Sequence, residues 1–170
     1  APLQETSHSL LDPCGIVVGA VDNAPARAAI ARVMAPGRWW VDAGNGAEFG
    51  QVLVGNAAKP QLAGAFDPAR GLCHALPVPT WVRPELLVPA PRPQPSCAGA
   101  VEAGEQGPTI NQLMAGLVVE VVRRLLGGRL TWWQAYLDME AGSLRTVPAT
   151  PEGVARLTCI KEHILLAERR

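Results

Sequence analysis

Residues 15–34 read GIVVGAVDNAPARAAIARVM and combine a short apolar run, a polar pair and an alanine-rich segment. The apolar run is bounded by turn-forming residues, which is typical of a strand buried on both faces in a parallel sheet. Asp22 and Asn23 then precede a helix predicted over residues 25–34, with a proline in its first turn. Strand, polar turn and helix make half of a βαβ unit. We therefore predict an α/β fold with a mainly parallel sheet flanked by helices.

The rest of the chain continues this mixture of strands and helices. Apolar residues at three- and four-residue steps predict a helix over residues 108–126, which two glycines then end. Nine of the sixteen prolines fall within residues 57–95, where we expect a Pro-rich crossover loop with little regular structure. The remaining expected elements are strands over 38–42 and 50–55, a C-terminal β-hairpin over 131–138 and 144–147, and a C-terminal helix or tail over 151–170.

Length and charge limit the classes of protein that fit. A chain of 170 residues with 48% hydrophobic and 18% charged residues has the composition of one folded domain. Fifteen basic residues balance fifteen acidic ones, so the totals give no sign of the broad basic face that binds nucleic acid. We therefore expect no nucleic-acid partner.

Compartment and metal chemistry are judged from the apolar runs and the cysteines. Charged residues interrupt the most apolar stretch, residues 113–126, which is shorter than the ~20 clean residues of a membrane span. No basic start followed by an apolar run marks an export signal, so we expect a soluble, cytoplasmic protein with no membrane partner. The four cysteines are scattered without a C-x-x-C pair, which favours reduced thiols and gives no support for zinc.

Asp22 is the first candidate for a ligand-binding residue. Ligands of open α/β sheets bind beyond the carboxyl ends of the strands, where Asp22 is expected. One carboxylate at such a place suits Mg²⁺, which is usually shared between one or two carboxylates and substrate phosphates. The alternative is that Asp22 and Asn23 only cap the following helix. Arg27, one helical turn later, either pairs with Asp22 or binds a phosphate group.

Two tryptophan pairs and several amides are weaker candidates. Successive strand residues point to opposite faces, so Trp39-Trp40 and Trp132-Trp133 should each place one ring inward and one outward. The outward rings suit a protein-contact surface. Asn45 lies in a Gly-Asn-Gly turn, and Asn111 near the start of the 108–126 helix is placed to contact a ligand.

The order of these segments resembles the ThiF-like adenylyltransferases, relatives of the ubiquitin-activating enzymes, and in particular the bacterial PRTRC plasmid-associated type. The resemblance covers about residues 14–150 and rests on several ordered motifs. It implies a Rossmann-like fold with residues 1–170 as a single, partial ThiF-like domain. The motifs are GAVDN-x-x-x-R over 19–27, VDAGN over 41–45 with GQVLVG over 50–55, SCA over 96–98, GPTINQ over 107–112 and YLDMEAGSL over 136–144.

The resemblance implies a reaction and a set of site residues. Asp22 would coordinate Mg²⁺ at the phosphates of ATP, and Asn23 and Arg27 would belong to the nucleotide site. The reaction would be the ATP-dependent adenylylation of the C-terminal carboxylate of a ubiquitin-like or sulfur-carrier protein. Cys97 would be a second catalytic residue that takes the activated acyl group as a thioester. The active form would be a homodimer or a heterodimer.

Two features of the family pattern are absent from the sequence. It contains no G-x-G-x-x-G loop, and residues 1–21 include no lysine or arginine with which to bind ATP. We therefore expect the chain to be a C-terminal portion, incomplete at its N-terminus and inactive alone. The alternative is a non-catalytic ThiF-like interaction module or one half of a heterodimer. An unrelated Rossmann-like nucleotide binder would also require the glycine-rich loop.

Overall fold

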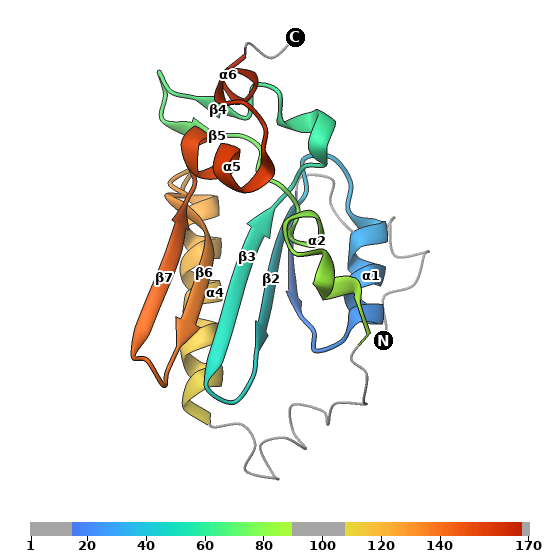
Figure 1. Cartoon of the computed structure of the whole chain (residues 1–170), viewed down its shortest axis with the longest axis vertical. Coiled ribbons are helices and arrows are strands. Elements are labelled where there is room, and N and C mark those ends of the chain that lie inside the picture. The colour runs from blue at the N-terminus through green and yellow to red at the C-terminus, as the bar shows by residue number, and fades with distance from the viewer. Residues whose placement is uncertain (1–14, 90–107, 168–170) are drawn as a thin grey trace.

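The computed structural model describes residues 15–89 and 108–167, which contain both strands and helices (Figure 1). The long strands are β1 (Ile16–Ala20), β2 (Trp39–Asn45), β3 (Phe49–Gly55), β6 (Trp132–Asp138) and β7 (Ser143–Pro148). The helices are α1 (Ala24–Val33), α2 (Pro79–Val82), α4 (Pro108–Leu126), α5 (Pro151–Thr158) and α6 (Glu162–Leu165). Shorter elements are the 3-10 helices η2 (Lys59–Leu62) and η3 (Pro84–Leu87) and the strands β4 (Phe66–Asp67) and β5 (Leu72–Cys73).

The long strands form one mixed sheet in the order β1-β2-β3-β6-β7. β1 and β2 are parallel, whereas β2·β3, β3·β6 and β6·β7 are antiparallel. The α/β class and the C-terminal hairpin are as predicted, but the expected mainly parallel sheet is wrong for the described residues. The turn between β2 and β3 is too short for the crossover that parallel neighbours need, so these strands run antiparallel.

Helices cover both faces of the sheet. Gly50 of β3 leaves room for the Met114 side chain of α4, so α4 lies against this face. Gly19 of β1 lies close to Ile30 of α1, and alternation along the strands assigns α1 to the opposite face. α2 lies in front of the sheet and α4 behind it (Figure 1). No described helix is both long and apolar enough to cross a bilayer.

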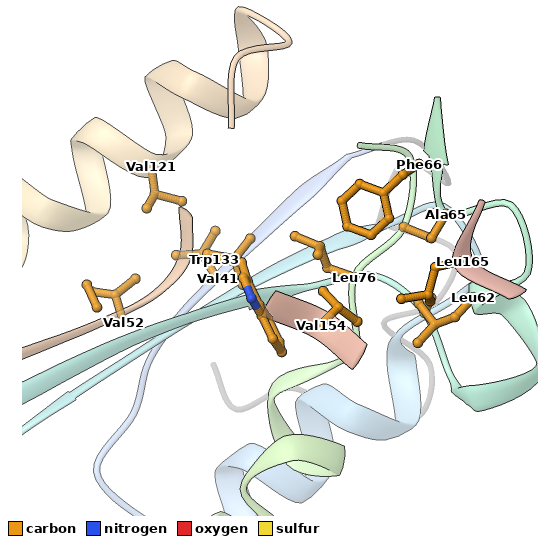
Figure 2. Close-up of a cluster of buried hydrophobic side chains, with 14 of the residues drawn as sticks. Val41, Val52, Leu62, Ala65, Phe66, Leu76, Val121, Trp133, Val154 and Leu165 are labelled. Atoms are coloured by element: carbon orange, nitrogen blue, oxygen red, sulfur yellow. The ribbon is translucent and has the colours of Figure 1, made fainter. Parts of the chain in front are cut away.

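The core extends from the α4 face of the sheet to the end of the molecule formed by residues 57–76 and the last two helices. Figure 2 shows Val41, Val52 and Trp133 of the sheet beside Val121 of α4. It also shows side chains from the Pro-rich segment packed with α5 and α6. The Pro-rich segment contributes Leu62, Ala65, Phe66 and Leu76, whereas Val154 comes from α5 and Leu165 from α6. The described part of the Pro-rich segment, residues 57–89, is therefore a layer of the core with short elements of its own.

The C-terminal helix is shorter than its sequence suggested. α5 begins at the Thr150 cap, whose hydroxyl accepts a hydrogen bond from the Gly153 amide. It ends at Cys159, which adopts the left-handed conformation (φ 57°), and α6 then begins after a break. One ring of each tryptophan pair is fully buried: Trp40 in the first pair and Trp133 in the second. The other rings, Trp39 and Trp132, are half-buried against the core and are not a free outward surface.

Alanine substitutions at two glycines are expected to change the free energy of unfolding in opposite directions. A Cβ at Gly55 would overlap the Pro77 carbonyl oxygen, whereas a Cβ at Gly116 of α4 would meet nothing. We predict that Gly55→Ala lowers the free energy of unfolding by about 1–3 kcal/mol, because the backbone of residue 77 must move. Gly116→Ala should raise it by about 0.5–1 kcal/mol through helix propensity. Urea unfolding of both variants measures the two effects, and a neutral Gly55→Ala would contradict the described contact.

Candidate functional site

A cavity of about 1040 Å³ lies where β1, β2, β3 and α4 meet. Its lining includes residues from both faces of the sheet and from the turn between β2 and β3. On the α4 face the lining is largely apolar and includes Val18, Met114 and Val119. On the α1 face it is polar and cationic, with Arg27, Gln51, Arg83, Tyr136 and Arg145. The cavity therefore offers two chemically different walls.

Asp22 lies directly after the carboxyl end of β1 and lines this cavity, as predicted. Asn23, and not Asp22, caps α1, because its Oδ1 accepts a hydrogen bond from the Ala26 amide at 2.9 Å. Asn23 Nδ2 also donates to Asp22 Oδ1 at 2.8 Å. The helix cap thus accounts for Asn23, while the exposed Asp22 carboxylate is left facing the cavity.

Arg27 extends from α1 to the sheet and pairs with Asp42 of β2. Its Nε lies 3.1 Å from Asp42 Oδ2 and 3.3 Å from Oδ1. Pairing with Asp22, one of the alternatives left open for Arg27, is therefore not what the structure shows. Asp42 is completely buried and Arg27 is 8% exposed, so this is an ion pair inside the protein. Gly44 makes room for the arginine, because a Cβ at this position would lie 2.8 Å from Arg27 Nη2.

Burial governs the protonation of Asp42. Desolvation raises the pKa of its carboxyl from 3.8 to about 6, although the charge of Arg27 and its hydrogen bond act in the lowering direction. Sequence reasoning missed this residue. The available signal was that Asp42 directly follows the apolar run Trp-Trp-Val. A carboxylate buried in such a strand requires a cationic partner.

A polar row crosses the sheet beside this pair. Gly44, Gln51, Tyr136 and Arg145 are register partners on β2, β3, β6 and β7 in turn. The Arg83 guanidinium lies 5.6 Å from the centre of the Tyr136 ring. The Tyr136 hydroxyl donates to Gln134 Oε1 at 2.7 Å, and burial raises the Tyr136 pKa. The single hydroxyl proton of Tyr136 is therefore engaged by Gln134.

The two weaker amide candidates meet on the other wall. Asn45 is the last residue of β2 and not part of a turn, and its Nδ2 donates to Asn111 Oδ1 of α4 at 2.8 Å. Both line the cavity. Their shared hydrogen bond joins the start of α4 to the end of β2, which gives both amides a structural role.

The thiol candidate is not tested by the structure. Cys97 lies outside the described residues, as does Cys14. Of the two described cysteines, Cys73 is half-buried with its Sγ 3.7 Å from the Ala75 carbonyl oxygen, and Cys159 is exposed at the end of α5. Neither lines the cavity.

No protein-family model matches the chain, and no curated protein matches it.

The raised Asp42 pKa predicts a specific pH dependence of stability. The folded state holds the Asp42 proton more tightly than the unfolded state, so between about pH 4 and pH 6 stability should fall as pH rises. The rise from 3.8 to about 6 corresponds to about 3 kcal/mol. Above pH 6 this contribution is constant. Carbon-detected NMR should find the Asp42 carboxyl midpoint near pH 6, and a midpoint near 4 would contradict the described burial.

Asp42→Asn supplies the comparison. This variant keeps the size of the side chain but cannot ionise, so its stability should not depend on the protonation of residue 42. It should therefore lose the decline between pH 4 and pH 6 that the wild type shows in urea unfolding. Hydrogen bonds from Arg123 and Arg124 lower the pKa of Glu120 to about 2, and this group acts in the opposite direction as pH rises. Both proteins keep Glu120, so the comparison between them cancels its contribution.

Proposed function

We propose that this chain takes part in the ATP-dependent adenylylation of a C-terminal carboxylate on a ubiquitin-like or sulfur-carrier protein. The observation that carries the proposal is the position of Asp22, an exposed carboxylate at the carboxyl end of β1, on a large cavity that also contains a buried arginine. Ligands of α/β sheets bind at this end of the strands. The finer assignment to a Rossmann-like fold of the ThiF type is part of the same proposal.

The donor set at Asp22 suits a shared magnesium ion. Asp22 accepts one hydrogen bond, from Asn23, and its carboxylate faces the cavity. Among the described residues no group of three or more His, Cys, Asp and Glu side chains is placed to hold a metal. Mg²⁺ would therefore be held by Asp22 together with nucleotide phosphates, and would neutralise their charge when bound. Asn23, in this proposal, orients Asp22 instead of contacting the nucleotide.

The proposed reaction forms one bond and breaks one. A carboxylate oxygen of the carrier protein bonds to the α-phosphorus of ATP, and the bond from that phosphorus to the bridging oxygen breaks, which releases pyrophosphate. Charge accumulates on the phosphate oxygens during this step, and preformed cations nearby lower its barrier. Arg27, Arg83 and Arg145 supply positive charge on the cavity wall. Thioester formation at Cys97 remains a further proposal about a residue outside the described part.

Pyrophosphate exchange tests the reaction. In a longer form of the protein that carries a glycine-rich ATP loop, and with a ubiquitin-like or sulfur-carrier protein present, labelled pyrophosphate should enter ATP. Asp22→Ala should reduce this exchange at least a hundredfold because the metal loses its protein ligand. Glu48→Gln, which removes an exposed carboxylate outside the cavity lining, is the matched control. Exchange that is unchanged in Asp22→Ala would contradict the assignment.

A second candidate is a non-catalytic ThiF-like protein-interaction module or one half of a heterodimer. Phe49 and Val119 line the cavity and are 65% and 67% exposed, which is unusual for large apolar side chains. This candidate predicts that the chain binds no Mg-ATP and that a partner binds Asp22→Ala as tightly as the wild type. Titration calorimetry of Mg-ATP with the longer form of the protein separates the two candidates, because only the adenylyltransferase should bind it.

A further inference from the structure

Arg27 is a buried cation whose guanidinium is only partly used by the protein. Both Asp42 oxygens contact the same nitrogen, Nε, at 3.1 and 3.3 Å. A bidentate arginine–carboxylate pair normally uses two nitrogens of the guanidinium. Here the terminal amino groups, Nη1 and Nη2, are not used by Asp42. Among the described residues no acceptor contacts Nη1 or Nη2 of Arg27.

These amino groups face the cavity. Arg27 is part of the cavity lining, whereas Asp42 is not. Nη2 lies beside Gly44, at a place that the Cβ of any other residue would approach within 2.8 Å. Nη1 and Nη2 form a planar fork, and such a fork matches the spacing of two oxygens on one carboxylate or phosphate group.

Stability alone does not explain the ion pair. Removing a guanidinium and a carboxylate from water costs several kcal/mol per ion, which their attraction seldom exceeds, and an apolar pair of similar volume is often as stable. What Asp42 does provide is a fixed orientation, because it holds the Nε edge and thereby turns the opposite edge of Arg27 toward the cavity.

We propose that Arg27, positioned by Asp42, binds one oxyanion, a carboxylate or a phosphate group, through Nη1 and Nη2. Arg27 is the binding residue and Asp42 is a positioning residue. Gln51, in register with Gly44, is placed along the same wall to donate a further hydrogen bond. Assigning the oxyanion to the carrier carboxylate or to ATP rests on the proposed function. Oxyanion binding itself does not.

The experiment titrates the 170-residue chain with two probes, inorganic pyrophosphate and N-acetylglycine, without Mg²⁺. The Nε–H signal of Arg27 in nitrogen-resolved NMR should shift saturably. Saturation by pyrophosphate identifies a phosphate site, and saturation by N-acetylglycine identifies a carboxylate site. If neither probe shifts this signal up to 50 mM, on the order of ten times a 5 mM dissociation constant, the proposal is wrong.

Matched variants separate binding from general charge. Arg27→Lys keeps the charge but loses the planar fork, so we expect affinity for the saturating probe to fall about tenfold or more. Arg32→Lys changes an exposed arginine on the last turn of the same helix and should leave affinity unchanged. Equal affinities for all three proteins would overturn the proposal. If Arg27→Lys fails to fold, the wild-type titration still decides.

The titration of Asp42 distinguishes a binding pair from a merely structural one. Arg27 is the charged group that acts on Asp42 among the described residues. A bound oxyanion places a second negative charge on the far side of Arg27, so the Asp42 carboxyl midpoint should move to higher pH when the probe is bound. An unchanged midpoint at saturation would show that the probe binds elsewhere and would overturn the proposal. Neither result depends on Asp22 or on adenylyl transfer.

Discussion

The buried ion pair between Arg27 and Asp42 is the constraint on which the site depends. It fixes α1 against the second strand of the sheet, where a charged carboxylate is tolerated only beside a cation. Gly44 leaves the space that the Arg27 guanidinium occupies. With α1 held in this way and its first turn capped by Asn23, the chain between β1 and α1 presents the Asp22 carboxylate to the cavity.

Local sequence patterns predicted the elements better than their arrangement. The apolar spacing within residues 108–126 gave α4 its full length, and Asn23 with the following proline marked the start of α1. The predicted strand directions are wrong because β1-α1-β2 is a parallel unit, and the prediction applied the same direction to the remaining strands. The short connection after Asn45 already contradicted this extension, since parallel neighbours need a crossover of about a dozen residues.

The candidate site was predictable only where it depends on neighbours in sequence. Asp22 follows from the end of β1, whereas the partner of Arg27 is fifteen positions away and depends on which face of β2 meets α1. Tyr136 and Arg83 come together through strand pairing and a proline-rich segment, neither of which has a local signal. The packing of residues 57–76 into the core likewise depends on α5 and α6.

The central claim is that the ion pair is kept for binding and not for stability. The most direct measurement is urea unfolding and anion titration of the double variant Arg27→Met with Asp42→Leu, alongside both single variants. We predict that each single variant loses about 3–5 kcal/mol, that the double variant returns to within about 1 kcal/mol of the wild type, and that it binds neither pyrophosphate nor N-acetylglycine. A double variant that still binds the anion, or one as unstable as the two losses combined, would contradict the claim.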